Sequence, residues 1–269
     1  MNTTVFSSEE LEHFRTWGYI RVTEALERAE VERFNKFVWK HLREKANILQ
    51  ENPTTWHQFT GCNGPNRESI DKVLGAEITP RLAEAVNQLL GKGQWRPLKT
   101  LGGLLMTMPD HTKPWERVLD WHFDNDPNNY VDNVNELMLF TFYTSVKAQG
   151  GGTLILAGSP RIVDHYLTAQ VQASKLADWS RGLAGWHEGL SNWHPWLAEL
   201  IGSHKSNAHT TRELMQETPD IHGVPARIME LTGEPGEAIL CHPTMFHAVS
   251  ANVTNVPRIM RRTNFRRKR

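Results

Sequence analysis

The order of segments along the chain is the feature that most limits its fold. Short apolar or alternating runs, separated by Asp, Asn, Pro and Gly, predict β-strands in two blocks, at residues 101–160 and 226–266. Helical, Trp-rich sequence at residues 161–225 separates the blocks. Because the strands do not alternate with crossover helices, we expect a mainly β fold. A double-stranded β-helix, that is, a jelly-roll or cupin-like core of about eight strands, fits this order.

Residues 1–100 are expected to be mostly helical and to pack outside this core. Ser7 and Glu10 have the spacing of a capping box, which predicts a helix beginning after Ser7. Two more helices are predicted over about residues 26–45 and 79–91, because apolar residues recur there at helical spacing. The polar stretch between them, residues 50–78, is expected to be a long loop.

Composition excludes several classes of protein. Lys+Arg and Asp+Glu number 30 each, so no overall field favours nucleic acid or an anionic membrane. The basic run at residues 261–269 is expected to be a solvated tail. Two cysteines cannot form a disulfide framework, and no apolar run reaches the roughly 18 residues that a membrane span needs. Residues 1–8 have no apolar signal core, so we expect one cytoplasmic domain over residues 1–269.

The first chemical signal is the pair His122 and Asp124, at the end of a strand predicted over residues 118–122. Residues two apart in a strand point to the same face, so both side chains can reach one metal ion. An imidazole with a carboxylate suits iron(II). The pair also fits a hydrogen-bonded histidine in a turn. With Asp126 it fits the zinc or two-metal site of a metal-dependent hydrolase, or, less well, the start of a calcium loop.

The second signal is a predicted hairpin near the end of the chain. One strand ends at His247, a polar turn follows through Asn252, and a returning strand begins at Arg258. The hairpin brings His247 and Arg258 into one pocket, where the guanidinium can hold a carboxylate through two parallel hydrogen bonds. A dicarboxylate cosubstrate would chelate iron with its 2-oxo acid end and place its other carboxylate on Arg258. A non-catalytic barrel that binds a carboxylate through Arg258 without metal remains an alternative.

These residues resemble the phytanoyl-CoA dioxygenase family of iron(II)- and 2-oxoglutarate-dependent oxygenases. That family has a His-x-Asp pair, a distal His and an Arg eleven residues later, a pattern matched here by His122, Asp124, His247 and Arg258. The Gly-rich strand at residues 150–161 and the N-terminal helix, strand and helix are also similar to the family, so the resemblance covers residues 7–265 except 45–100 and 162–225.

The resemblance implies an enzyme that needs Fe(II), 2-oxoglutarate and O2. His122, Asp124 and His247 would bind the iron, and Arg258, assisted by Thr153, would bind 2-oxoglutarate. His242 competes with His247, but the spacing to Arg258 favours His247. Because a carboxylate occupies position 124, hydroxylation or another oxidation of a C–H bond is expected rather than halogenation. The substrate is expected to be a small molecule, and a role in secondary metabolism is one interpretation.

The chain departs from the family at two places. Ala157 and Pro160 replace the Pro and His of a Pro-Gly-Ser-His turn, and Val249 stands where the family has a Ser, with Ser250 one position later. The first departure puts the shape of the turn in doubt. The second leaves one hydrogen bond to the cosubstrate to be supplied by another group.

The segment between the two strand blocks holds four tryptophans within 18 residues, Trp179, Trp186, Trp193 and Trp196. A lid over the active site is one expected role, because excluding water protects a reactive centre. Packing of helices onto the barrel and a dimer contact are equally compatible with this composition. The histidines of this segment are not expected to bind the metal.

Overall fold

The computed structural model describes residues 4–75, 77–124, 134–172, 182–206 and 209–268. Helices make up 37% and strands 23% of the structure, so the fold is mixed α and β and not mainly β as expected. The strand blocks lie close to their predicted positions. The difference comes from helices that flank the core, because residues 50–78 contain two of them and residues 159–214 contain four.

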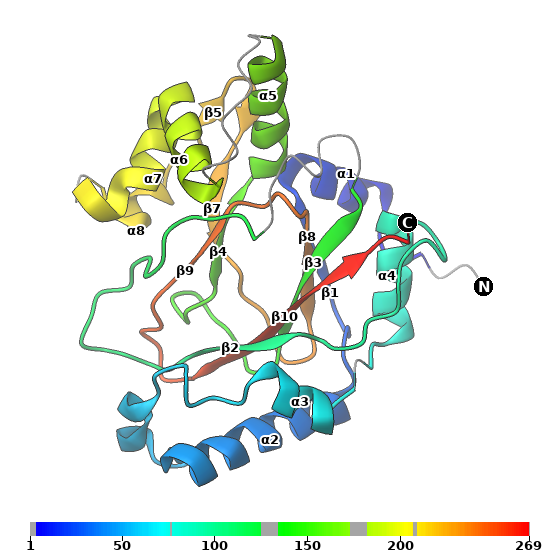
Figure 1. Ribbon diagram of the computed structural model, residues 1–269, viewed down its shortest axis with the longest axis vertical. Helices are drawn as coiled ribbons and strands as arrows, with labels where there is room; N and C mark the ends of the chain where they lie inside the picture. The colour runs from blue at the N-terminus through cyan, green and yellow to red at the C-terminus, as the bar shows by residue number, and fades with distance from the viewer. Residues whose placement is uncertain (1–3, 76, 125–133, 173–181, 207–208, 269) are drawn as a thin grey trace.

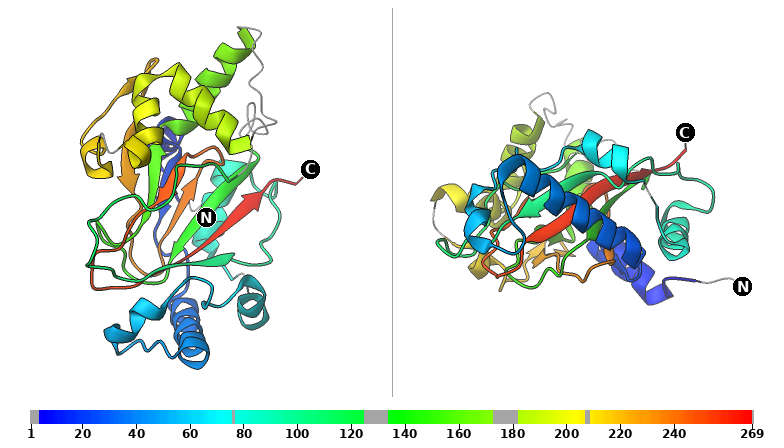
Figure 2. Two further views of the ribbon diagram at one scale, coloured as in Figure 1. Left: turned by 60° about the vertical axis from the view of Figure 1, so that its left-hand side comes forward. Right: turned by 90° about the horizontal axis from the view of Figure 1, so that it is seen from below.

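Eight strands form two antiparallel sheets, as the residue pairings show. The large sheet has the order β1 (Tyr19–Val22), β8 (Ala238–Cys241), β3 (Glu136–Phe142), β10 (Arg258–Arg266), β2 (Gly103–Thr107). The small sheet has the order β7 (Arg227–Glu230), β4 (Thr153–Ala157), β9 (His247–Val249). Figures 1 and 2 show the small sheet lying beside the large one, and a short ribbon of β5 (Asp220–Ile221) and β6 (Val224–Pro225) completes the strands.

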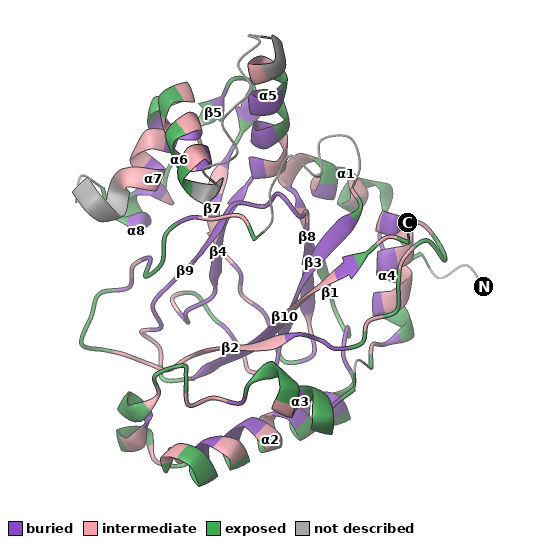
Figure 3. Ribbon diagram, in the orientation of Figure 1, coloured by how far each residue is buried: buried purple, intermediate pink, exposed green. Residues whose placement is uncertain are grey.

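The inward faces of the two sheets form one apolar cluster. Met138, Phe140 and Met260 of the large sheet belong to the same buried cluster as Ile155 of β4. Alternation along each strand therefore sends every second side chain into the space between the sheets and the others toward helices. Figure 3 shows the resulting pattern, in which β3, β4 and β8 are buried throughout, the edge strand β2 is half-buried, and α2 has an exposed side.

Helices cover the outer face of each sheet. A large buried cluster joins the large sheet to α1 (Ser8–Trp17), α2 (Arg28–Ala46), η1 (Pro53–Gln58), α3 (Arg67–Val73) and α4 (Pro80–Leu90). A second cluster joins the small sheet to α5 (Ser159–Gln172), α6 (Gly182–Trp193), α7 (Pro195–Ser206) and α8 (Thr211–Leu214). Figure 1 shows α5 to α8 at one end of the molecule and α2 and α3 at the other. No helix in the described ranges is long and apolar enough to cross a membrane.

The helix starts follow the sequence closely. Ser7 and Glu10 form the expected capping box, and Gly18 ends α1 in the left-handed conformation, with φ of 79°. Thr79 caps α4 by accepting a hydrogen bond from the amide of Leu82, and Pro80 is the first helical residue. These signals involve only residues that are neighbours in the chain, so the sequence alone predicts them.

Two expectations about connecting segments are wrong. The loop expected over residues 50–78 contains η1 and α3, whose N-caps are Asn52 and Asn66. The strand expected over residues 118–122 does not form. This segment pairs with β9 and the residue after it only at isolated bridges, Arg117 with Ser250 and His122 with His247. It lies along the edge of β9 and is too irregular to form a continuous ladder.

The basic run at residues 261–269 was expected to be a solvated tail, but its first residue is not solvated. Arg261 is fully buried, and its guanidinium lies over the ring of Phe34, 4.9 Å from the centroid, while its Nε donates to the carbonyl of Gly102. Its neighbour Arg262 points to the opposite face of the sheet. Both belong to β10, in which they follow the buried Ile259 and Met260.

Candidate metal centre

His122, Asp124 and His247 meet between the two sheets. One ligand atom from each lies within 4.8 Å of the others, which is close enough for a single metal ion. The two histidines come from segments 125 residues apart in the sequence, and the residues between them form β3, β4 and the helical insertion. The structure thus brings together the three side chains that the sequence selected as ligands.

Backbone pairing holds the two histidines in register. The amide of His122 donates to the carbonyl of His247 at 2.8 Å, and the amide of His247 donates back to the carbonyl of His122 at 3.0 Å. Residues paired in this way point to the same side, so the rings lie together, with centroids 4.3 Å apart. The segment at residues 118–122 therefore positions His122 beside His247 without forming a regular strand.

Each imidazole is oriented by a carbonyl two residues before it. Nδ1 of His122 lies 2.8 Å from the carbonyl oxygen of Asp120, and Nδ1 of His247 lies 2.9 Å from that of Met245. A carbonyl oxygen only accepts, so each Nδ1 carries a proton and Nε2 is the nitrogen left to face a metal. Nε2 of His247 lies 3.2 Å from Oδ2 of Asp124, which places it on the cluster side. Such outer hydrogen bonds are typical of histidines that bind metals.

The surroundings keep the ligands in the protonation states that a metal requires. Burial lowers the pKa of His122, and the neighbouring His247 lowers it further, so the imidazole is neutral at pH 7. Burial alone would raise the pKa of Asp124, but the hydrogen bond and charge of His247, with Arg262, hold it below its ordinary value. The carboxylate is therefore ionised, and a borderline cation such as iron(II) suits this donor set.

Arg258 begins β10 and is almost completely buried. Its Nε and Nη1 have no hydrogen-bond partner within the described residues, which is unusual for a buried guanidinium. Burial lowers its pKa to about 10, and the charge of Glu230 opposes that change. The side chain stays cationic at neutral pH. A buried cation with unused donors is the receptor expected for the carboxylate of a bound molecule.

The hairpin before Arg258 is shaped by Asn252. Its side-chain oxygen accepts from the amide of Thr254 at 3.0 Å, and its Nδ2 donates to the carbonyls of Thr107 and Val256. These bonds close the turn and tie it to the end of β2. The family-like Asn and Thr thus set the position at which Arg258 enters the sheet.

The other predicted residues take different positions. Thr153 is buried on β4, two residues from the partner of His247, so both face the interior between the sheets. Ser250 donates to the carbonyl of Gly152 at 2.8 Å and so stabilises the backbone. His242, the competing ligand, lies outside the metal cluster and contacts Thr244 through Nδ1 at 2.8 Å.

The turn after β4 differs from the family pattern as the sequence indicated. Ala157 ends the strand, Gly158 has φ of 94°, and α5 begins at Ser159. A side chain at Gly158 would lie 2.4 Å from the carbonyl oxygen of Pro225, so the position requires glycine. Pro160 occupies the first turn of α5, a position that suits proline.

The sequence places Arg262 on the same strand face as Arg258 and leaves two roles open, contact with the substrate or a solvated strand end. In the structure its Nη2 forms an ion pair with Oδ2 of Asp124. The available signal was period two along β10, because Arg258 and Arg262 are four residues apart and therefore share a face.

The Trp-rich insertion packs on the small sheet. Trp186 and Trp196 are buried in one cluster with Leu154, Leu156 and Phe246. Trp193 is partly buried against the same cluster, and Trp179 lies outside the described residues. Next to Trp186, the ring of His187 places Nε2 2.6 Å from the carbonyl oxygen of Trp121. The insertion thus contacts the segment that carries the metal-facing residues, while a role as a lid stays a prediction.

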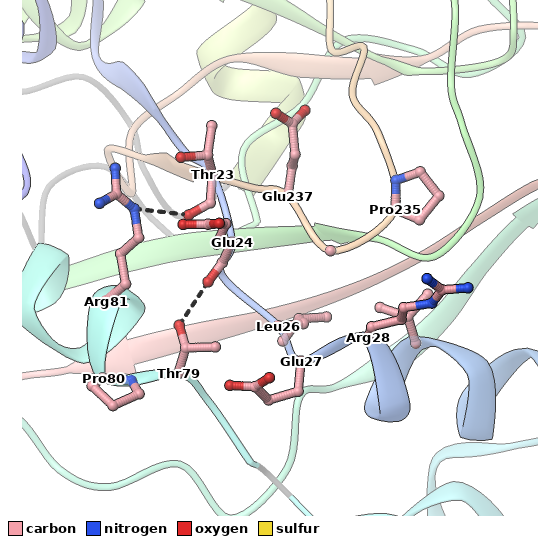
Figure 4. A pocket seen from close by; sticks show the side chains of 12 residues that line it. Thr23, Glu24, Leu26, Glu27, Arg28, Thr79, Pro80, Arg81, Pro235 and Glu237 are labelled. Carbon is pink, nitrogen blue, oxygen red and sulfur yellow. Dashed lines mark hydrogen bonds between the residues drawn. The ribbon is translucent and has the colours of Figure 1, made fainter.

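A pocket of about 850 Å³ lies elsewhere on the surface, where the end of β1, the start of α4 and the turn before β8 meet. Figure 4 shows its polar rim, in which Arg81 donates to the carbonyl of Thr23 and Thr79 donates to that of Glu24. None of its lining residues belongs to the metal cluster. Asp126, the third residue of the alternative hydrolase site, lies outside the described residues.

The fold and the three-residue cluster can be compared with known proteins. Over nearly its whole length, the chain is similar in fold to solved non-heme, alpha-ketoglutarate-dependent enzymes, and it brings His122, Asp124 and His247 together between its sheets. No protein-family model matches the sequence, and no curated protein matches it either.

Three solved structures carry this comparison. EctD from S. alaskensis, with 2-oxoglutarate and 5-hydroxyectoine, is 17% identical, with 99% of this chain and 78% of EctD covered and a TM-score of 0.51. SnoK, a non-heme alpha-ketoglutarate-dependent carbocyclase from nogalamycin biosynthesis, is 15% identical, with 98% and 86% covered and a TM-score of 0.51. The epimerase SnoN from the same biosynthesis is 13% identical, with 96% and 81% covered and a TM-score of 0.50. At these identities the shared property is the fold.

Proposed function

We propose that the chain is an Fe(II)- and 2-oxoglutarate-dependent dioxygenase that oxidises an unactivated C–H bond of a small molecule, with hydroxylation as the simplest outcome. Succinate and CO2 are the other products. The observation that carries the proposal is the pairing of a His-Asp-His cluster with a buried, unpaired guanidinium at Arg258, both facing the space between the sheets. A metal-dependent hydrolase would not need Arg258, and a simple carboxylate-binding barrel would not need the cluster.

The protein's own residues supply three things. His122, Asp124 and His247 would hold Fe(II) through two imidazole nitrogens and a carboxylate, and the lowered pKa values of His122 and Asp124 favour the unprotonated forms that a metal requires. Arg258 binds the far carboxylate of 2-oxoglutarate, with Thr153 as a second contact, and so fixes the direction in which the cosubstrate lies. The apolar side chains between the sheets, among them Phe140 and Met260, exclude water around these groups.

The bound iron supplies the activation of oxygen, and 2-oxoglutarate supplies two electrons as it is converted to succinate and CO2. His122, Asp124 and His247 would supply three ligands and so leave further positions on the ion for these partners. Asp124 is the ligand that distinguishes this arrangement from one with a free position for a halide, which is why we propose oxidation of a C–H bond.

The neighbours support a small molecule as the substrate. EctD was solved with 5-hydroxyectoine, and SnoK and SnoN are a carbocyclase and an epimerase of an antibiotic biosynthesis. One fold therefore serves hydroxylation, ring closure and epimerisation, and the outcome depends on how a substrate is held. A role in secondary metabolism is part of the proposal on this ground.

The test is succinate formation from 2-oxoglutarate by protein loaded with Fe(II), with and without oxygen. Wild type is expected to form succinate only in air. Asp124→Ala and His247→Ala are expected to lower the rate at least about 100-fold, because each removes a ligand and weakens metal binding, which is measured separately by calorimetry with Ni(II).

The matched control is His165→Ala, which removes an exposed histidine of α5 and is expected to leave both measurements unchanged. Full activity in either ligand variant would refute the metal assignment. Activity that persists under nitrogen would favour the hydrolase alternative.

A further inference from the structure

A second guanidinium faces the same space as the proposed metal. Arg262 pairs with Phe140 of β3, and the ring of Phe140 lies 6.4 Å from the ring of His247. Arg262 is therefore at the level of the metal ligands, while Arg258 lies four residues away along β10, opposite Thr107. At about 3.3 Å per residue, the two arginines are about 13 Å apart along the strand. The carboxylate that Arg258 would hold therefore cannot also be the one that meets Arg262.

The donors of Arg262 are only partly used within the described residues. Nε and Nη2 are buried and form no well-aligned hydrogen bond to any residue within the described ranges. Nη2 does contact Oδ2 of Asp124 as an ion pair. That oxygen also lies 3.2 Å from Nε2 of His247, so it is the oxygen nearest the position of a metal ion. Metal binding at this oxygen leaves the guanidinium beside a divalent cation.

The geometry of the unused donors selects a ligand. Nε and Nη2 lie on one edge of a guanidinium and form the fork that binds the two oxygens of a carboxylate in parallel. The side chain of Arg262 is 25% exposed, whereas Arg258 is only 4% exposed. A molecule that enters from solvent therefore reaches Arg262, and Arg258 lies deeper.

We infer that Arg262 is the recognition residue for the substrate, and that this substrate is a small molecule bearing a carboxylate. The inference rests on the function proposed above. Binding of that carboxylate beside the metal would place a neighbouring C–H bond near the reacting position, and it would explain why an arginine occupies the inward face at this level of β10.

The test uses matched pairs of small molecules, each an acid and its primary amide, on full-length protein loaded with Ni(II) and 2-oxoglutarate. Binding is measured by calorimetry, without turnover. We expect acids to bind at least about tenfold more tightly than their amides, the size of effect that one charge-assisted pair provides. Benzoate with benzamide and hexanoate with hexanamide are the first probes, within a panel of small acids.

Variants of Arg262 then test whether this residue causes the preference for acids over amides. Arg262→Gln should remove the preference for acids, and Arg262→Lys should restore part of it, since an ammonium keeps the charge but not the fork. The control is Arg266→Gln at the exposed end of the same strand, which should keep the preference in full.

The outcomes separate this inference from the proposed function. If wild type with Ni(II) fails to bind 2-oxoglutarate, the proposed function fails. If 2-oxoglutarate binds but the amides bind as tightly as their acids, or no acid in the panel binds, the inference on Arg262 is overturned alone. If Arg262→Gln weakens only the affinity for Ni(II) and keeps the preference for acids, Arg262 merely positions Asp124, which also overturns the inference.

Discussion

Two backbone carbonyls determine which nitrogen of each metal-facing histidine is available. The carbonyls of Asp120 and Met245 each accept from Nδ1 of the histidine two residues later, so both rings present Nε2 to the cluster. The same i−2 relation on two unrelated segments means that the orientation comes from an extended local backbone. The sequence names the histidines, but the choice of nitrogen depends on this backbone and becomes visible only in three dimensions.

The burial of one residue, His242, predicts how the free energy of unfolding depends on pH. Burial lowers its pKa from 6.5 to about 4, so the unfolded chain takes up a proton below pH 6.5 that the folded chain takes up only near pH 4. This stabilising contribution is complete above pH 6.5. It is lost progressively as the pH falls from 6.5 to 4. Between pH 7 and pH 5 the loss is about 2 kcal/mol, an upper value because the ring keeps an exposed edge.

The measurement is urea unfolding of metal-free protein at pH 7 and pH 5. His242→Asn keeps an acceptor for Thr244 and cannot be protonated, so its free energy of unfolding should fall by about 2 kcal/mol less than that of wild type. The exposed His165→Asn serves as the control and should behave like wild type. Equal losses in wild type and His242→Asn would show that His242 is not the group responsible.

The site residues differ in how far the sequence reveals them. His122, Asp124, His247 and Arg258 stand at fixed spacings, and the resemblance to a known family made them legible. Arg262 shares a strand face with Arg258 by period two, and its neighbour Arg261 lies fully buried on the opposite face. The spacing leaves the role of Arg262 open, and only the three-dimensional structure shows its ion pair with Asp124.

At the scale of elements, α6 links the insertion to the metal-facing segment. The ring of Trp186 lies 5.2 Å from that of Phe123, and His187 contacts the carbonyl of Trp121. These two contacts flank His122 on either side in the sequence. The packing of α6 therefore limits the movement of a segment that has only isolated bridges of its own.

Substitution of Trp186 tests this link. Trp186→Ala should lower the free energy of unfolding by about 3–5 kcal/mol, because a buried indole is lost, and should weaken Ni(II) binding about tenfold by loosening the ligand segment. Trp193→Ala on the same helix is the control. Trp193 packs on Tyr166 and His222 instead, so its loss should lower stability while the affinity for Ni(II) is kept. Equal affinities for Ni(II) in both variants would contradict the link.

Elements with local signals were predicted well, and those that depend on tertiary contacts were not. The capping box at Ser7 and the Thr79-Pro80 start of α4 need only neighbouring residues. The helix at Arg67–Val73 is short and polar, and its stability comes from packing of Ile70 in the core, which no local pattern shows. The segment at residues 118–122 has strand-like composition, yet it pairs only at isolated positions beside β9.

For the whole molecule, the metal site and the cosubstrate site lie on different sheets. His247 belongs to β9 of the small sheet, and Arg258 belongs to β10 of the large sheet. A diacid held by the metal at one end and by Arg258 at the other would connect the sheets across their shared interior. Binding should therefore stabilise the fold as a unit, in an obligatory order of metal and then 2-oxoglutarate.

Thermal unfolding with Ni(II) tests this coupling. A ligand at 100 times its Kd adds about 2.7 kcal/mol, which corresponds to a rise in Tm of about 2–4 °C for each kcal/mol in a chain of this size. Wild type should show one rise with Ni(II) and a further rise with 2-oxoglutarate only when Ni(II) is present. In Arg258→Ala the rise with Ni(II) should persist, because its ligands are intact, and most of the rise with 2-oxoglutarate should be lost. Pyruvate, a 2-oxo acid without the second carboxylate, is the control and should stabilise wild type and Arg258→Ala equally. A full rise in Tm of Arg258→Ala with 2-oxoglutarate would show that Arg258 does not bind the far carboxylate.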